Sequence, residues 1–242
     1  MTLKLGCGWP PMGMESRGSA APRSETNGSS STRRRAPLKP NEIIIASRNR
    51  HKIEEIRALL RDLPVKLLSA DEVADVPSEI REDGTTFVEN AAQKARAVAR
   101  AARAFAIADD SGLEVPALDG EPGVLSARYA GPEATDADNN RKLLDRMHAL
   151  PDKSRRARFR CAVALASPDG EILLATEGSC EGRILREPRG DGGFGYDPLF
   201  LVPGQGKTFA ELGETVKNRI SHRAEAVRAM RHALDEMMAA RG

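Results

Sequence analysis

The sequence predicts an α/β fold, and three observations favour it. Short β-branched apolar runs alternate with segments whose apolar residues recur at helical spacing, and a later pair of alternating segments is joined by a turn. Strands and helices mix throughout the chain without an internal repeat. The 242 residues, 40% of them hydrophobic and 30% charged, are enough for one large or two small domains.

The first predicted strand and helix enclose a loop that is suited to ligand binding. Residues 42–46 form an apolar run typical of a buried strand. A helix is expected from Lys52, where apolar residues begin to recur at helical spacing, with Glu54 and Glu55 on its solvated face. The loop of residues 47–51 therefore joins the carboxyl end of a strand to the amino end of a helix, where α/β sheets tend to bind ligands.

A capping motif and an apolar run define the next two elements. Thr86-x-x-Glu89 has the form of a capping box, and it precedes an alanine-rich helix expected to run to about Ala104. Residues 105–108 then predict a buried strand, which is expected to stop at the polar residues 109–112.

The second half of the chain predicts four further features. They are a helix around residues 143–150, an antiparallel hairpin of residues 159–165 and 171–176 turned by residues 167–170, a strand at 199–202, and a closing helix around 227–237.

Charge divides the chain into a basic extension and a mildly acidic body. Residues 1–40 carry seven Lys or Arg and two Glu, so the total of +2 less +5 for this segment leaves −3 for residues 41–242. The extension is rich in Ser, Gly, Pro and Arg, which predicts disorder, with transient contact to RNA or membrane as the alternative to a solvated tail. An acidic body argues against stable nucleic-acid binding.

Composition also bounds the compartment. No apolar stretch is long enough to span a membrane, and the opening residues lack the apolar region of a secretion signal, so a cytoplasmic protein without membrane attachment is expected. The three cysteines form no Cys-x-x-Cys pair and are odd in number, which favours incidental thiols over a disulfide framework or zinc site.

Ser47-x-Asn49-x-x-Lys52 is the first candidate binding motif. A hydroxyl, an amide and an ammonium group together suit phosphate oxygens. Helix capping by Ser47 or Asn49 is the structural alternative, and the local sequence does not exclude it.

Asp109-Asp110 is the second candidate, as a metal site. Two adjacent carboxylates repel each other unless a cation or proton is shared between them. Both can serve one site only if they lie where the strand ends, as expected here. Hard oxygen ligands at such a place suit Mg²⁺ bound together with substrate phosphates, and an exposed Asp-rich turn is the alternative.

Two segments near the end of the chain indicate recognition of a flat or anionic group. Residues 190–195 match G-x-G-x-x-G, but a strand rather than a helix follows, so a dinucleotide fingerprint is not supported. Phe194 and Tyr196 on this flexible backbone could stack on a base, with core filling by Phe194 as the alternative. Lys217, Ser221, His222 and Arg223 gather donors for base edges or anions, although a solvated helix start would look similar.

Taken together, these segments resemble the inosine triphosphate pyrophosphatase family over about residues 42–238. The motifs that carry the resemblance, in chain order, are Ser47-x-Asn49-x-x-Lys52, Phe87-x-Glu89-Asn90-Ala91, residues 108–113, Pro122-Gly123, Ser126-Ala127-Arg128, residues 192–198 and Ile220-Ser221-His222-Arg223. The resemblance implies a long central mixed sheet flanked by helices, two lobes with a cleft between them, and a homodimer. It places the enzyme domain in residues 41–242.

The same resemblance implies an activity and a set of site residues. Non-standard purine nucleoside triphosphates (dITP, ITP, XTP) would be hydrolysed to the monophosphate and pyrophosphate with Mg²⁺, before they enter nucleic acid. Asp110 matches the catalytic base and a metal ligand, beside Asp109 and a further carboxylate placed at Glu82. The implied substrate-binding residues are Ser47, Arg48, Asn49, Arg50, His51, Lys52, Lys94, Ser111, Phe194, Gly195, Tyr196, Asp197, Lys217, His222 and Arg223.

Two other functions compete with this hypothesis. One is a similarly folded pyrophosphatase that acts on modified pyrimidine nucleotides, which a substrate panel would separate. The other is a non-catalytic nucleotide sensor, which has no need of paired carboxylates beside the phosphates.

Overall fold

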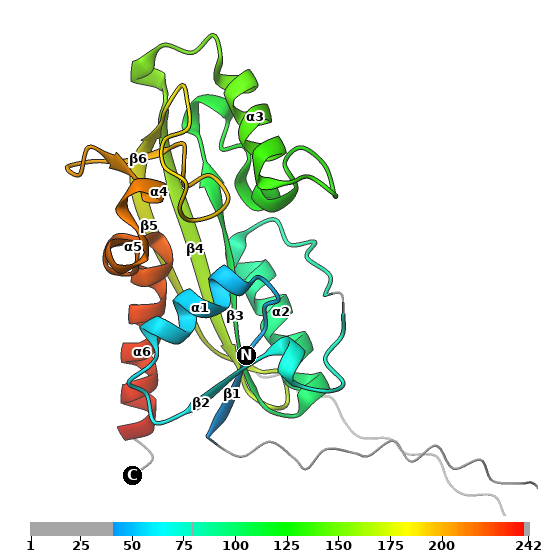
Figure 1. Cartoon of the computed structure of the whole chain (residues 1–242). Coiled ribbons are helices and arrows are strands. Elements are labelled where there is room, and N and C mark those ends of the chain that lie inside the picture. The colour runs from blue at the N-terminus through cyan, green and yellow to red at the C-terminus, as the bar shows by residue number, and fades with distance from the viewer. Residues whose placement is uncertain (1–40, 79, 240–242) are drawn as a thin grey trace, which may run out of the picture. The chain divides into compact units, whose positions relative to one another are not determined.

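A seven-stranded mixed sheet lies at the centre of this computed structural model, which describes residues 41–78 and 80–239 (Figure 1). The strand order is β2-β1-β3-β4-β5-β6-β7. The strands are β1 (Glu42–Ile45), β2 (Lys66–Ser69), β3 (Phe105–Glu114), β4 (Arg156–Ala166), β5 (Ile172–Ile184), β6 (Phe200–Val202) and β7 (Lys207–Thr208). The predicted α/β class is confirmed, while the predicted extension at residues 1–40 lies outside the described residues.

Six α-helices accompany the sheet in the described part of the chain. They are α1 (Arg50–Leu59), α2 (Phe87–Ala102), α3 (Asp136–Met147), α4 (Phe209–Leu212), α5 (Glu214–Ile220) and α6 (His222–Ala239). None of these helices is long and apolar enough to cross a bilayer.

The strands are parallel toward the β2 edge of the sheet and antiparallel toward the β7 edge. Strand β1 pairs in parallel with both β2 and β3, and every pairing from β3 onward is antiparallel. The predicted hairpin is confirmed as β4 and β5, although both strands extend well beyond the predicted limits.

Alternation along the strands sends side chains to two different helical layers. Ile43 and Ile45 pack in the cluster that includes α1 and α6, whereas Ile44 packs in the cluster that includes α2. The same alternation holds in β3, where Ile107 belongs to the first cluster and Ala108 to the second. The two layers are visible on opposite sides of the sheet in Figure 1.

Local signals account for the helix ends. The Thr86 hydroxyl accepts from the Glu89 N–H, and the Glu89 carboxylate accepts from the Thr86 N–H, so the predicted capping box of α2 is confirmed. Helix α2 ends at Ala102 because Arg103 adopts the left-handed conformation, with φ of 51°.

The expectation that the strand stops at residues 109–112 was wrong. Strand β3 continues to Glu114 and pairs with β4 from Ala106 to Glu114 without interruption. Two adjacent carboxylates are expected to end a buried strand, because a buried carboxylate without a partner costs free energy. In the fold, Asp109 and Asp110 find those partners on opposite faces of the sheet, so the strand does not need to end.

A short turn packs directly on β3 beyond these carboxylates. Gly112 has no side chain, and a Cβ there would overlap with the Ser126 hydroxyl and the Gly123 carbonyl. The Ser126 hydroxyl accepts from Leu113 N–H at 2.9 Å and donates to the Gly123 carbonyl at 2.6 Å. The 3₁₀ turn of residues Gly123–Arg128 is thereby fixed against the strand.

Candidate active site

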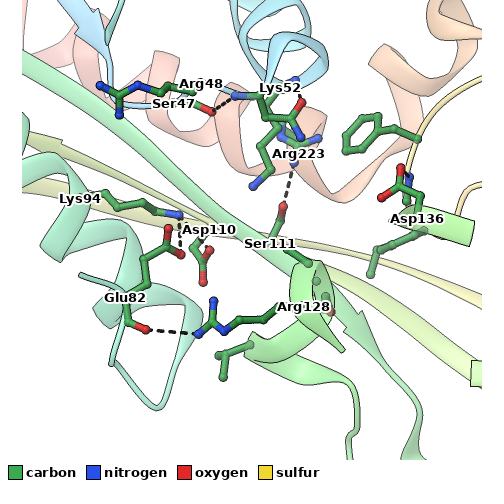
Figure 2. A pocket seen from close by; sticks show the side chains of 18 of the residues that line it. Ser47, Arg48, Lys52, Glu82, Lys94, Asp110, Ser111, Arg128, Asp136 and Arg223 are labelled. Carbon is green, nitrogen blue, oxygen red and sulfur yellow. Dashed lines mark hydrogen bonds and ion pairs between the residues drawn. The ribbon is translucent and has the colours of Figure 1, made fainter. Parts of the chain in front are cut away.

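A cleft of about 810 Å³ brings together most of the predicted site residues (Figure 2). All of them line it except Arg50, His51 and Asp109. The predicted residues that line the cleft are Ser47, Arg48, Asn49, Lys52, Glu82, Lys94, Asp110, Ser111, Phe194, Gly195, Tyr196, Asp197, Lys217, His222 and Arg223. Segments far apart in the sequence therefore share one cavity, as the hypothesis requires.

The loop between β1 and α1 combines capping with a cationic edge. The Asn49 carboxamide oxygen accepts from the Lys52 N–H at 3.2 Å, and the Ser47 hydroxyl accepts from the Asn49 N–H at 3.2 Å. Asn49 is therefore the N-cap of α1, as the structural alternative supposed, while its loop still faces the cleft. Capping does not remove the loop from the cleft, because Ser47, Asn49 and Lys52 all line the cavity.

The basic residues of this loop differ in position. Arg48 lines the cleft, but its guanidinium pairs with Asp71 at 2.9 Å and donates to the carbonyls of Pro77 and Ser78. Arg50 is exposed and lies outside the cleft lining. His51 also lies outside it, yet its ring stacks on Phe194, with centroids 5.1 Å apart and planes inclined by 8°.

Asp109 points to the layer of α1 and α6. Its Oδ2 lies 3.1 Å from Lys52 Nζ and 3.0 Å from Arg223 Nη2. Burial works to raise the pKa of Asp109, but Lys52 and Arg223 outweigh it and hold that pKa well below the ordinary range. Asp109 is therefore a buried anion between two cations, and Ser111 on the same face accepts a hydrogen bond from Arg223 at 2.8 Å.

Asp110 points to the opposite layer, toward α2. Its Oδ1 lies 2.9 Å from Lys94 Nζ, and its Oδ2 accepts from the Asn90 amide at 3.2 Å. Burial raises the pKa of Asp110 against the opposing effect of Lys94 and Lys52. The two adjacent aspartates therefore do not share one partner, contrary to the expectation from a strand end.

Lys94 joins Asp110 to Glu82 at one end of the cleft. The Lys94 Nζ lies 3.2 Å from Glu82 Oε2 as well as 2.9 Å from Asp110 Oδ1. Burial alone would lower the pKa of Lys94, but Asp110, Asp109 and Glu82 outweigh it and raise that pKa. Figure 2 shows the three side chains converging.

This end of the cleft has carboxylate oxygens, which are the ligands that Mg²⁺ prefers. Glu82 and Asp110 offer carboxylates on either side of a single cation, so both are directed at one point. Across the described residues, no group of three or more His, Cys, Asp or Glu is placed to hold a metal ion. The protein would therefore supply two carboxylates, and substrate phosphates and water would supply the remaining ligands, as is usual for Mg²⁺.

A buried charge network forms the other end of the cleft. Lys217 Nζ lies 2.6 Å from Asp197 Oδ2 and 3.0 Å from Glu55 Oε1, and Glu55 also pairs with Arg223. The Lys217 ammonium lies 4.2 Å from the centre of the Phe194 ring. A half-buried aromatic face with cationic donors beside it suits a flat, oxygen-bearing base.

Glu55 was assigned to the solvated face of its helix, and that expectation was wrong. The residue is 7% exposed, and its carboxylate connects Lys217 to Arg223. Burial works to raise the pKa of Glu55, but Arg223 and Lys217 outweigh it and lower that pKa. Helical spacing does place Glu55 three residues after Lys52, on the side that faces the cleft, and this was the available signal.

The glycine-rich loop that carries Phe194 is held from two sides. Asp136 accepts from the Gly195 N–H at 2.6 Å, and Asn140 donates to the Gly195 carbonyl at 2.8 Å. Asp197 accepts from the Phe194 N–H at 2.9 Å. No sequence motif indicates Asp136 or Asn140, because their partner is a peptide group.

Tyr196 lines the cleft as expected, but it is buried rather than open to a stacked base. It is 4% exposed, and its hydroxyl donates to the Ser126 carbonyl at 2.9 Å. Tyr196 therefore anchors the loop to the turn of residues 123–128, and Phe194 is left as the more exposed aromatic of the pair.

Comparison with known proteins places the whole described fold in one family. The model of the Ham1 family matches residues 43–233. The chain belongs to the Ham1 family. The match spans β1 through most of α6, so every segment that lines the cleft lies within it.

Relatives of this Ham1 chain agree in sequence and in structure. A dITP/XTP pyrophosphatase of Desulforamulus reducens is 48% identical over 196 residues, covering 81% of this chain and 96% of the relative. Its counterpart in Geobacter sulfurreducens is 49% identical over 192 residues, covering 79% and 96%. The structure of a HAM1 protein from Coxiella burnetii superposes with a TM-score of 0.74 at 47% identity, covering 81% of this chain and 98% of that one.

His222 makes the stability of this Ham1 chain depend on pH. Burial, with Arg223 and Lys217 nearby, lowers the pKa of His222 well below 6.5. Below pH 6.5 the unfolded chain therefore binds a proton that the folded chain refuses, so stability falls as pH falls. We expect the free energy of unfolding to lose about 1.4 kcal/mol per pH unit below 6.5 from this residue.

Urea unfolding of the ligand-free protein between pH 7.5 and 5.5 measures this loss. His222→Asn should flatten the dependence over that interval. His232→Asn is the matched control, because the His232 side chain is 79% exposed, and it should leave the dependence unchanged. Equal slopes for the parent protein and His222→Asn would contradict a neutral, buried His222.

Proposed function

We propose that this Ham1 family member hydrolyses the non-standard purine nucleoside triphosphates dITP, ITP and XTP to the monophosphate and pyrophosphate, which removes them before incorporation into nucleic acid. The curated relatives named dITP/XTP pyrophosphatase support this function. The main support from the structure is that the two ends of the cleft carry different chemical groups. One end holds Asp110 and Glu82 around Lys94, and the other holds Phe194 beside Lys217.

The reaction consumes one water molecule. Its oxygen forms a bond to the α-phosphorus, the bond from that phosphorus to the oxygen bridging to the β-phosphorus breaks, and pyrophosphate leaves with that bridging oxygen. Asp110 lies on the wall of the cleft and can accept the proton of the attacking water when it is ionised. Lys52 and Lys94 stabilise the negative charge that develops on the phosphates.

Mg²⁺ belongs to this proposal, with Asp110 and Glu82 as its protein ligands. When bound, it would neutralise phosphate charge and thereby lower the barrier to attack. Asp109 was a third candidate ligand, but Lys52 and Arg223 already hold its Oδ2 from the opposite face of the sheet. We therefore assign Asp109 to orientation of those two cations.

Base selection follows from the donors at the Phe194 end. Hypoxanthine and xanthine carry a keto oxygen at C6, where adenine carries an amino group. Arg223 has only donors to offer, so it suits the keto oxygen and leaves an amino group unmatched. An unpaired buried donor costs about 1–3 kcal/mol, which supports discrimination against adenine nucleotides.

The proposal places the activity in residues 41–242, as the family match from residue 43 supports. It also includes assembly as a homodimer and a cytoplasmic location. No stable nucleic-acid partner is included, because residues 41–242 carry a formal charge of −3.

Pyrophosphate release from dITP, ITP, XTP, GTP and dCTP, with and without Mg²⁺, tests the function. We expect turnover of the first three with Mg²⁺ and at least about tenfold lower kcat/KM for dCTP, which lacks the purine ring. Release of orthophosphate instead of pyrophosphate would contradict cleavage between the α- and β-phosphates. Preference for dCTP would favour the pyrimidine-specific alternative.

A further inference from the structure

The basic side chains that line the cleft differ in what neutralises them. Arg48 pairs with Asp71, Lys52 with Asp109, Lys94 with Asp110 and Glu82, and Lys217 and Arg223 with Glu55. Arg128 also lines the cleft, and among the described lysines and arginines of that lining it is the one with no ion pair. Within residues 41–78 and 80–239, its guanidinium makes a single hydrogen bond, from Nη2 to the Glu82 carbonyl at 3.3 Å.

Arg128 is placed by a rigid part of the fold. It is the last residue of the 3₁₀ turn that packs on Gly112, and Ser126 fixes this turn to β3 by two hydrogen bonds. Tyr196 adds a third hydrogen bond to the same turn, through the Ser126 carbonyl. The arginine therefore extends from a fixed base rather than from a flexible loop.

The guanidinium lies at the Lys94 end of the cleft. Its acceptor is the backbone of Glu82, the residue whose carboxylate contacts Lys94. Figure 2 shows Arg128 directed from its turn toward Asp110 and Glu82, on the side of the cleft opposite Ser47 and Lys52. The other end of the cleft is formed by Phe194 together with Lys217 and Arg223.

We propose that Arg128 binds the β- and γ-phosphates of the substrate and holds the pyrophosphate as it leaves. This inference rests on the proposed pyrophosphatase function. A guanidinium offers paired donors that match two phosphate oxygens, and most of those on Arg128 are unused. With the base at the Phe194 end and the α-phosphate beside Asp110, the terminal phosphates extend toward Glu82 and Arg128.

The charge balance of the cleft supports the same assignment. A triphosphate brings about four negative charges, and every other lining lysine or arginine named above already faces a carboxylate. Arg128 adds a positive charge that no carboxylate of the described residues offsets. It is therefore available to the leaving group without the loss of an existing ion pair.

A structural role is the competing explanation, because Arg128 also tethers the segment of residue 82 through one hydrogen bond. The two roles differ in which product they affect. Loss of a tether would disturb Glu82 and Asp110, and would therefore weaken the binding of both products, pyrophosphate and the monophosphate. Loss of a pyrophosphate contact would weaken pyrophosphate and spare the monophosphate, which has no β- or γ-phosphate.

Calorimetric binding of pyrophosphate and of IMP, each with Mg²⁺, to Arg128→Gln and to the parent protein separates these roles. We expect pyrophosphate to bind about tenfold more weakly or worse, and IMP to bind within about twofold of the parent. The pyrophosphate affinity of Arg128→Lys should lie between those of the parent protein and Arg128→Gln, because lysine keeps the charge but lacks the paired donors.

Arg81→Gln is the matched control for loss of one positive charge. Its side chain is 86% exposed and pairs with Asp83, next to Glu82 in sequence, and the variant should bind both products as the parent does. Unchanged pyrophosphate binding in Arg128→Gln, or equal weakening of both products, would overturn the inference. A parent protein that releases no pyrophosphate from dITP would instead refute the proposed function.

Discussion

Replacing Asp110 by asparagine is expected to lower kcat for dITP by at least about 100-fold, the contribution typical of a general base. Asparagine keeps the shape of the side chain and can still accept from Lys94, but it cannot take a proton from water. Nucleotide affinity measured without Mg²⁺ should change little, because Phe194, Lys217 and Arg223 at the other end of the cleft are untouched. Steady-state kinetics with a separate binding measurement distinguishes the two effects.

Asn90→Ala is the matched control for the Asp110 result. It removes the other hydrogen bond to this carboxylate, 3.2 Å long, while it leaves the carboxylate itself in place. We expect a loss of kcat much smaller than that of Asp110→Asn. Turnover by Asp110→Asn at the parent rate would refute the assignment of Asp110 as the base.

Replacing the neighbouring Asp109 by asparagine is expected to destabilise the fold by about 3–5 kcal/mol. Asp109 is 1% exposed and accepts from both Lys52 and Arg223, so the neutral side chain leaves two cations at a buried site without their shared anion. The stability cost should be present without any ligand. Urea or thermal unfolding of the ligand-free protein measures it.

Asp110→Asn serves as the comparison for this second result. Burial raises the pKa of Asp110, so folding disfavours its charged form relative to the unfolded chain, whereas folding favours the charged form of Asp109, and a neutral replacement should cost less stability at Asp110. The two substitutions are chemically identical and one residue apart. Equal losses of stability would contradict the assignment of Asp109 as a charged group that stabilises the fold and of Asp110 as a catalytic group.

Much of the fold followed from local patterns. The apolar run at residues 42–46, the capping box at Thr86 and the hairpin turn at residues 167–170 depend on neighbours in sequence, and the structure confirms each. The end of β3 was misjudged because its continuation depends on Lys52, Lys94 and Arg223, which belong to other elements. Local patterns do not contain such partners.

The site was predicted to a similar degree and for similar reasons. Residues with distinctive motifs were placed in the cleft, whereas Glu55, Asp136 and Asn140 were missed. Glu55 reads as an ordinary polar position of an amphipathic helix until the partners on α5 and α6 are known. Asp136 and Asn140 act on the peptide of Gly195, a group that every sequence position possesses. The family resemblance supplied the catalytic roles, and these remain predictions.

The alternation of β3 has a consequence for how the protein tolerates change. A shift of this strand by a single position would turn both carboxylates to the opposite face of the sheet, so that Asp109 would leave Lys52 and Arg223, and Asp110 would leave Lys94. Both sets of charge pairs thus depend on one shared alignment, held by the continuous ladder with β4. An insertion or deletion in this strand is expected to break both sets of pairs together, whereas a point substitution removes one of them.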